Sequence, residues 1–267
     1  MDILGYVGAV LMGVSLGFFG GGGSILTVPI LVYLFNIDPV LATAYSLFIV
    51  GVTSLVGSFS HMKMGNIDFR TALVFGIPAI ISVYLTRRML LPAIPENLFT
   101  IGELEVNKSL GLLLLFAIIM LLASWSMIRP SRNSNNEPVQ NSGYNYPLIL
   151  TEGVVVGVVT GLVGAGGGFL IIPALVLLGG LEMKKAVGTS LFMIALKSLI
   201  GFTGDLSGKL IIDWHFLIMF SVIAIIGILA GSVLSKRVSN EKLKPAFGWF
   251  VLAMGTYILL KETIWAG

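Results

Sequence analysis

The chain has 267 residues, of which 56% are hydrophobic and only 11% are charged, and its formal net charge is +3. About 25% charged residues is usual for a soluble domain, so this composition excludes an ordinary water-soluble protein. The absence of cysteine excludes disulfides, thiolate catalysis and cysteine metal sites.

Apolar stretches of roughly 20 residues recur along the chain, and this length crosses a hydrocarbon core of ~30 Å. We therefore predict an all-α polytopic membrane protein, a multi-pass protein of the cell membrane. The basic residues fall in loops between the spans, so the positive charge does not indicate a nucleic-acid partner. Eight helical segments are expected, at 3–35, 39–61, 69–89, 107–128, 147–179, 184–203, 214–234 and 243–262.

Two glycine clusters show that the chain is an internal duplication. The first runs from Gly17 to Pro29 and the second from Gly161 to Pro173, at a constant offset of 144 residues. Six of these thirteen positions are identical, and the register continues downstream without a gap. Each cluster interrupts a long apolar segment at the same place. Paired helix breaks of this kind mark the substrate site in membrane transporters.

A polar stretch rich in Asn, Ser and Pro separates the two copies. We predict an N-terminal transmembrane repeat at 1–128, a linker at 129–146 and a C-terminal transmembrane repeat at 147–267. Each half then contains four segments. The stretch from Pro92 to Asn107 is expected to be a loop outside the bilayer core.

The first and fifth segments are too long for one span, and two interpretations are open. Each is either one long kinked span or a re-entrant hairpin. Loop charges favour one of them without excluding the other, because cytoplasmic loops carry an excess of Lys and Arg. The hairpin form gives inverted repeats and places ten basic residues on one side and five on the other, whereas the kinked form divides them 9 to 6. We favour inverted repeats with glycine-broken first and fifth segments. The side with five basic residues includes Arg87 and Arg88, at the end of the expected segment 69–89.

The sequence resembles the TauE/SafE sulfite exporter family in both glycine clusters and in the segments that follow them. The resemblance lies in Gly20–Pro29 followed by Ala42–Ser46, and in their second copies, Gly164–Pro173 and Ala186–Ser190. It covers essentially the whole chain. It implies a secondary transporter of a small sulfur-containing anion, such as sulfite, thiosulfate, a sulfonate or a sulfur-bearing carboxylate.

The glycine breaks are the first candidate substrate site. A glycine-rich break exposes backbone N–H groups, and the helix that follows presents the positive end of its dipole, where anions bind well. The alternative is that the glycines only allow tight helix packing. The candidate substrate-binding residues of the two breaks are Gly20, Gly21, Gly22, Gly23 and Ser24 in the first half and Gly164, Gly166, Gly167 and Gly168 in the second.

Lys197 is the sharpest single candidate. It lies near the middle of an otherwise uncharged span, where a lysine costs at least ~2.5 kcal/mol. A buried cation facing a broken helix attracts an oxyanion. The alternative is a lysine that snorkels to the membrane interface.

Four further residues complete the predicted site. Ser46 and Ser190 are repeat equivalents whose hydroxyls suit sulfite or sulfonate oxygens, while other hydroxyls on the same helices are expected to bond between helices. His61 and Asp205 are also equivalents, and either can handle protons if transport is proton-coupled. The competing interpretation places them as interfacial loop residues. No metal site and no cofactor are predicted.

The sequence therefore predicts a transporter that works by alternating access on a small sulfur-containing anion, with protons as a candidate coupling ion. An anion channel built on the same breaks is the first alternative, and a non-transporting membrane scaffold is the second. An enzyme is not expected, because the sequence has no HExxH motif and no paired intramembrane carboxylates.

Overall fold

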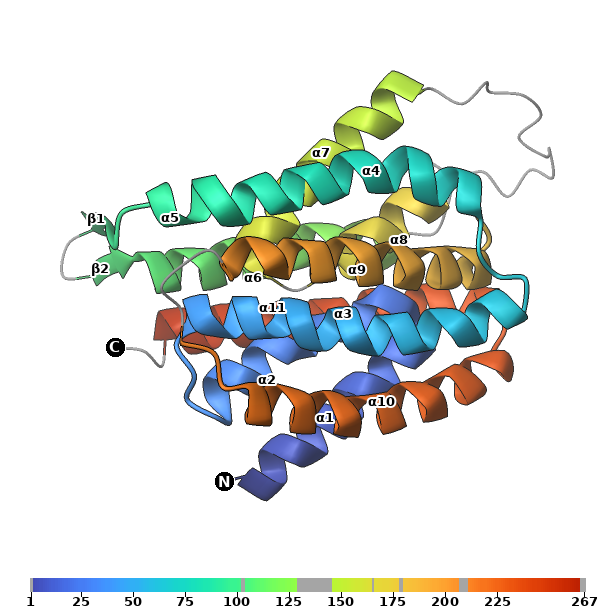
Figure 1. Ribbon diagram of the computed structural model, residues 1–267, viewed down its shortest axis with the longest axis horizontal. Coiled ribbons are helices and arrows are strands. Elements are labelled where there is room, and N and C mark those ends of the chain that lie inside the picture. The colour runs from blue at the N-terminus through green and yellow to red at the C-terminus, as the bar shows by residue number, and fades with distance from the viewer. Residues whose placement is uncertain are drawn as a thin grey trace.

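The computed structural model describes residues 2–101, 104–128, 146–164, 166–177, 180–206 and 211–264. These residues form a helical bundle with one short two-stranded hairpin (Figure 1). The elements of the first half are α1 (Asp2–Phe19), the 3₁₀ helix η1 (Gly20–Leu26), α2 (Thr27–Tyr33), α3 (Pro39–Lys63), α4 (Phe69–Leu85), the π-helical turn η2 (Thr86–Leu90), α5 (Leu91–Ala93), β1 (Asn97–Ile101), β2 (Leu104–Asn107) and α6 (Lys108–Ile128). The second half contains α7 (Tyr146–Val163), α8 (Gly168–Leu177), α9 (Met183–Asp205), α10 (Trp214–Lys236) and α11 (Asn240–Ile264).

Aspartate residues start three of the long helices. The Asp38 carboxylate accepts hydrogen bonds from Val40 N and Leu41 N, at 2.9 and 3.3 Å, and Pro39 follows in the first turn of α3. Asp68 and Asp213 cap α4 and α10 in the same way. These caps satisfy amides that have no partner within the helix and fix where each helix begins.

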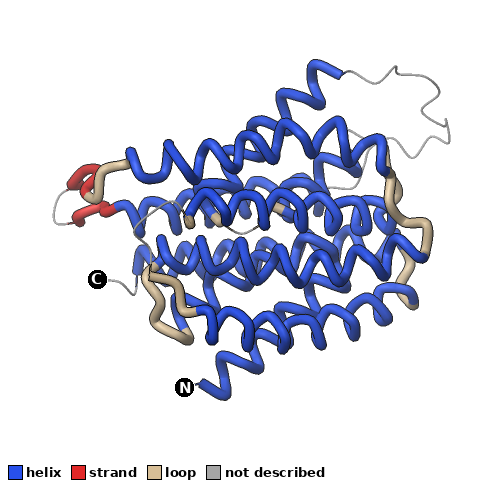
Figure 2. The backbone as a smooth tube through the Cα atoms, viewed as in Figure 1, coloured by secondary structure: helices blue, strands red, loops and turns tan. Residues whose placement is uncertain are grey.

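The homologous helices α3 and α9 pack against each other in opposite directions. Leu47 lies against Gly201, Leu199 against Gly51, and Leu191 against Gly57, so the numbers fall on α9 as they rise on α3. In Figure 1, α3 runs from blue to cyan toward the right and α9 from gold to orange toward the left. The long helices lie along the longest axis of the molecule, and most of the loops gather at its two ends (Figure 2).

The other main helix contacts also join one half to the other. Helix α1 packs along α10, and its equivalent α7 packs along α4, the equivalent of α10. Glycines on α1 and α7 allow close approach in the two pairs, for example Gly13 against Ala224 and Gly157 against Ala79, and Gly227 and Gly231 on α10 also lie directly against α1. Helices α6 and α11 pair with each other. Each half is therefore bound mainly to the other half.

The first broken segment is a hairpin. Phe35 lies against Gly5, Ile30 against Gly8, and Gly23 against Leu16, so the chain after the glycines returns along α1. In Figure 1 the fifth segment also turns back, since α7 descends to the left and α8 runs to the right. Glycine makes the turns possible, because Gly20 and Gly164 have φ of 69° and 73°.

Two reciprocal hydrogen bonds join the turns before α4 and α10 to helices of the opposite half. The backbone N–H of Asp68, before α4, donates to Thr189 Oγ1 on α9 at 2.9 Å. The backbone N–H of Asp213, before α10, donates to Tyr45 Oη on α3 at 2.7 Å. Tyr45 and Thr189 are repeat equivalents, so each half completes a turn of the other.

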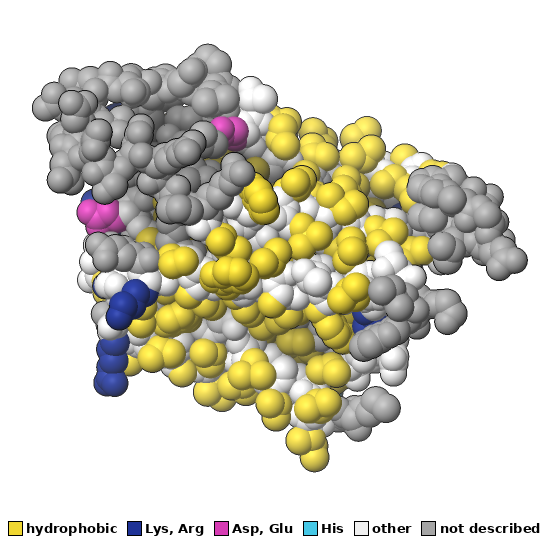
Figure 3. Space-filling model, turned by 180° about the vertical axis from the view of Figure 1, so that it is seen from behind, with side chains coloured by type: hydrophobic (Ala, Val, Ile, Leu, Met, Phe, Trp, Pro, Cys, Tyr) yellow, Lys and Arg dark blue, Asp and Glu magenta, His cyan; other side chains and the backbone are white. Residues whose placement is uncertain are grey.

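The outer surface carries apolar stripes at helical spacing. One runs along α4 and another along α10. Figure 3 shows hydrophobic side chains over the broad face and basic side chains gathered at one edge. Within the described residues, five helices are long and apolar enough to cross a membrane: Pro39–Lys63, Phe69–Ala93, Lys108–Trp125, Met183–Asp205 and Trp214–Ser235. The exposed stripe residues are Phe69, Leu73, Ile77, Ile81 and Leu85 on α4, and Trp214, Ile218, Val222, Ile226, Leu229 and Val233 on α10.

One expectation from the sequence needs correction, the expected break near 20–24 is present, and others remain untested. The expected loop at Pro92–Asn107 contains the end of α5 and the antiparallel pair β1–β2. The first break is wound as a 3₁₀ helix, in which Ser24 Oγ donates to Gly21 O at 2.5 Å. The predicted linker at 129–146 lies outside the described residues except for Tyr146, and the division into two repeats stays a prediction. The inverted arrangement across a membrane also stays a prediction.

Candidate functional site

The tips of the two hairpins meet in the middle of the molecule. Gly21 and Gly168 approach so closely that a Cβ on either would overlap the backbone of the other. Gly166 lies against Ser24 of the opposite tip and against Val50 and Ile194, which are repeat equivalents on α3 and α9. Gly21, Gly166 and Gly168 thus lie at one junction between the two breaks, beside Val50 of α3 and Ile194 of α9.

Backbone conformation explains why several junction positions are glycine. Gly164, Gly166 and Gly167 have φ of 73°, 64° and 63°, in the left-handed region that other residues rarely adopt. Gly23 has ordinary φ but lies directly on the backbone at Leu16. The structure does not describe the surroundings of Gly22, so its predicted role is untested.

Lys197 lies beside the second tip. Its side chain is 1% exposed, and Nζ donates to Thr160 Oγ1 at 3.1 Å. A Cβ on Gly167 would stand 2.7 Å from Nζ, so the ammonium lies against the backbone of the break. Within the described residues no carboxylate forms an ion pair with Lys197. Its burial contradicts the snorkelling alternative.

The Lys197 ammonium also stands near the start of α8. This helix of 10 residues begins at Gly168, one residue after the glycine that Nζ approaches. The first amides of a helix lack intrahelical partners and carry a partial positive charge. Two positive groups therefore lie together at a buried point, an arrangement that an anion between them would stabilise.

The predicted hydroxyls are buried near the junction but differ in their bonding. Ser190 Oγ donates to Val187 O at 2.8 Å and lies against Gly20. Ser46 is fully buried, and its Oγ has no hydrogen-bond partner among the residues that the structure describes. The same holds for Thr27, Thr53, Ser54 and Ser198. Thr53 is the repeat equivalent of Lys197, and Ser54 and Ser198 are equivalents of each other.

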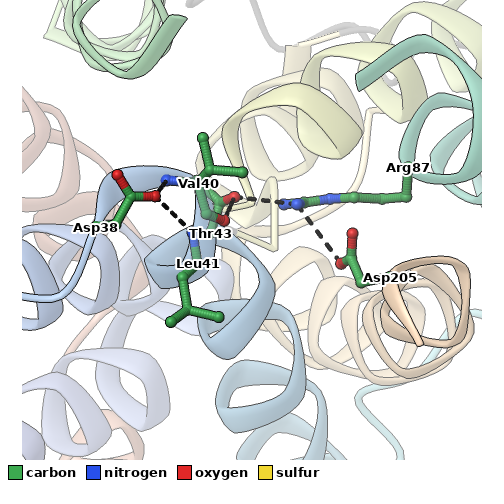
Figure 4. Close-up of polar contacts among 6 residues, drawn as sticks. All are labelled: Asp38, Val40, Leu41, Thr43, Arg87 and Asp205. Atoms are coloured by element: carbon green, nitrogen blue, oxygen red, sulfur yellow. Dashed lines mark hydrogen bonds and ion pairs between the residues drawn. The ribbon is translucent and has the colours of Figure 1, made fainter. Parts of the chain in front are cut away.

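The structure adds a residue that the sequence did not suggest, Arg87. It lies in η2, within the expected helical segment 69–89, and its side chain is 1% exposed, so it is not a solvent-accessible flanking charge of the kind that the charge count treated it as. Figure 4 shows its guanidinium between α3 and α9. Nη1 donates to Thr43 Oγ1 at 3.0 Å and pairs with Asp205 Oδ2 at 3.5 Å. The guanidinium also lies against Gly164, where no side chain intervenes.

Asp205 and His61 are not the interfacial loop residues that the competing interpretation requires. They lie in α9 and α3 and are 6% and 2% exposed. Asp205 faces Arg87, so it is not the partner of Lys197. Asp205 gave a weak indication in the sequence that a buried cation lies nearby, because a carboxylate at the end of an apolar helix is stabilised by a positive partner.

A metal site receives no support from the described residues, since no three His, Cys, Asp or Glu side chains gather there. Among the described residues, the polar groups at the junction include hydroxyls, glycine backbone, the Lys197 ammonium and, beside Gly164, the Arg87 guanidinium. These are hydrogen-bond donors suited to oxygen atoms of an anion.

Comparisons with known proteins agree with this architecture. The family model described as "Sulfite exporter TauE/SafE" matches residues 6–258. A "Probable membrane transporter protein" of Xylella fastidiosa is 30% identical over 261 residues, covering 96% of this chain and 93% of the relative. One of Methanocaldococcus jannaschii is 27% identical, covering 94% and 92%, and one of Bacillus subtilis is 28% identical, covering 88% and 91%. No solved structure matches the chain. The protein is thus a multi-pass membrane protein, and it belongs to the TauE/SafE sulfite exporter family.

Proposed function

We propose that the protein is a secondary transporter of a small sulfur-containing oxyanion, which binds at the junction of the hairpin tips. The observation that carries this proposal is Lys197. Its buried ammonium bonds to one neutral hydroxyl, and no described carboxylate pairs with it. An unneutralised charge at the centre of a membrane protein is costly, and a transported anion supplies the missing partner.

The exchange of contacts between the halves supports alternating access. Helices α3 and α9 are homologous, long enough to span, and antiparallel. If both cross the bilayer, the repeats are inverted, and a site between them can be opened to either side by equivalent motions. The family membership argues for transport and against catalysis. Proton coupling through His61 or Asp205 remains part of the proposal, and the Asp205–Arg87 pair gives that carboxylate a structural role as well.

Flux measurements in proteoliposomes test the proposal. The wild type should take up sulfite or thiosulfate saturably and show counterflow. Lys197→Met should lose about 10- to 100-fold in affinity, the equivalent of a hydrogen bond to a charged group. Lys197→Arg should retain part of it, because the charge is kept while the geometry changes. Lys185→Met, on the exposed side of the same helix, is the matched control.

Two outcomes would contradict this assignment. Unchanged anion affinity in folded Lys197→Met would return Lys197 to a structural role. Ohmic conductance in planar bilayers, without counterflow, would favour the channel. The melting temperature of Lys197→Met should be at least that of the wild type, because an unpaired buried charge is removed.

A further inference from the structure

A small cavity lies at one end of the bundle, away from Lys197. Its volume is about 150 Å³. The lining residues come from the end of α3 and its following turn, the start of α9 and the end of α10: His61, Met64, Asn66, Lys184, Ser232 and Ser235. Since a liquid water occupies about 30 Å³, a four-atom oxyanion fits here with part of its hydration.

The chemistry of the lining favours an anion. Lys184 supplies an ammonium, Asn66 an amide, and Ser232 and Ser235 supply hydroxyls, while no Asp or Glu lines the cavity. Ser232 is 1% exposed, and its Oγ makes no hydrogen bond within the described parts of the chain. A buried hydroxyl that borders a cavity without a protein partner indicates a site for a ligand atom or ordered water.

The cavity adjoins the first hairpin. Gly17, at the end of α1, lies against the backbone at Ser232, and Gly188 lies against Asn66. Two residues after Gly188, Ser190 meets Gly20 at the break itself. An anion held in the cavity would therefore be next to the tip that leads to Lys197.

The equivalent place in the other half holds an ion pair. By the offset of 144, His61 corresponds to Asp205, and Arg87 corresponds to Gly231, the neighbour of Ser232. Thus one end holds a cavity where the other end holds the Arg87–Asp205 pair. Such a difference between the two equivalent ends of a duplicated frame is expected of an alternating-access protein in a single state.

The charge around the cavity supports entry of an anion from this end. The antiparallel packing brings the end of α3, the starts of α4 and α9 and the end of α10 together, and with them a group of basic residues. Such a field raises the local concentration of anions. The group comprises Lys63, Arg70, Lys184, Lys185, Arg237 and Lys242.

We propose that this cavity is a second oxyanion site, which loads the anion at the basic end of the bundle before it reaches the hairpin junction. Lys184 and Ser232 are its main ligands. The proposal depends on the proposed function only for the class of anion. A phosphate group of an anionic lipid has similar chemistry, and the experiment separates the two sources.

The experiment is calorimetric titration of the full chain in phosphatidylcholine nanodiscs with sulfite, thiosulfate and ethanesulfonate. It is performed in Lys197→Met, so that only the second site is measured. At least one of the three anions should still bind. Lys184→Met and Ser232→Ala should each weaken that binding by about ten-fold, since each removes a hydrogen bond to a charged ligand. Lys185→Met and Ser221→Ala are controls. Ser221→Ala should change nothing, and Lys185→Met, which removes one of several charges of the surrounding field, should weaken binding much less than Lys184→Met.

The controls are closely matched. Lys185 is the exposed neighbour of Lys184 and has the same charge. Ser221 lies on α10 like Ser232, is 3% exposed, and its Oγ also makes no hydrogen bond to a described residue, but it does not line the cavity. Equal weakening in test and control variants would overturn the proposal, because it would indicate a diffuse charge effect.

Three other outcomes are decisive. Absence of binding of all three anions in Lys197→Met overturns the second site and leaves the proposed function intact. Retained binding that Ser232→Ala weakens supports the second site, even if Lys197→Met transports normally and the proposed central site fails. The third outcome concerns lipid. If none of the three anions binds in Lys197→Met, and phosphatidylglycerol raises the melting temperature of the wild type but not that of Lys184→Met or Ser232→Ala, the cavity binds lipid and the proposal is wrong.

Discussion

The protein buries the cations Arg87 and Lys197 in different surroundings, since among the described residues one is paired with a carboxylate and the other is not. Arg87 has a carboxylate and a hydroxyl within reach, whereas Lys197 has one hydroxyl and glycine backbone. Removal of one partner of a buried pair leaves the other charge uncompensated, while removal of an unpaired charge does not. Substitutions of the two cations should therefore affect stability in different ways.

We expect Arg87→Met to destabilise the protein by about 3–5 kcal/mol, because Asp205 is left buried without its cation. The double variant Arg87→Met/Asp205→Asn should recover part of the loss. Arg88→Met is the control. Arg88 is exposed, bonds to Tyr84 Oη at 2.6 Å, and should change stability by no more than about 0.5 kcal/mol. Thermal unfolding in detergent measures all three, and equal melting temperatures for Arg87→Met and Arg88→Met would contradict this reading of the pair.

The contrast also shows what sequence reasoning can find. Lys197 was predictable because a lysine in the middle of an apolar helix has a known cost. Arg87 was not, because it stands beside Arg88 near the end of an apolar segment, where arginines usually reach the interface. Its burial depends on Gly164, Thr43 and Asp205, which are distant in sequence.

At the scale of elements, the contact between the hairpin tips limits the side chains there to a hydrogen atom. Gly21 and Gly168 are in backbone contact, so one methyl group at either position forces the tips apart. The repeat pattern identified these glycines as the breaks. It did not reveal that the two breaks touch, because contact between halves leaves no mark in the spacing within each half.

Gly21→Ala should therefore abolish transport or reduce it at least about ten-fold while the protein still inserts, since the tips are displaced from the junction. Gly76→Ala is the matched control. Gly76 lies inside α4, and an added Cβ would meet only Met193 at 3.8 Å, an ordinary contact. Uptake by purified variants in proteoliposomes compares the two. Normal uptake by Gly21→Ala would mean that the close contact of the tips is not needed for transport.

At the scale of the whole molecule, the orientation in the membrane follows from the charge distribution. The basic end described above should face the cytoplasm, and the loop between α9 and α10 should face outward. Charge counting and the antiparallel packing of α3 and α9 both favour the inverted arrangement, which stays a prediction, and the sequence alone left the kinked form open. What settled the hairpin form of the first segment was side-chain contact between α1 and α2, which periodicity does not contain.

Cysteine labelling tests this orientation in a chain that has no cysteine of its own. Lys63→Cys and Ser239→Cys, at the basic end, should resist a membrane-impermeant maleimide in intact cells and react after permeabilisation. Ile211→Cys should react in both conditions, because Ile211 is 91% exposed at the other end. Opposite behaviour of Lys63→Cys and Ser239→Cys would exclude the inverted arrangement.

The reciprocal hydrogen bonds of Asp68 and Asp213 also set an order of events during synthesis. Chains emerge from the ribosome N-terminus first. The amide of Asp68 must wait for Thr189, made 121 residues later, whereas the amide of Asp213 finds Tyr45 already in place. The turn before α4 therefore gains this hydrogen bond only after the second half has been made, whereas the turn before α10 can form its bond as soon as it is synthesised.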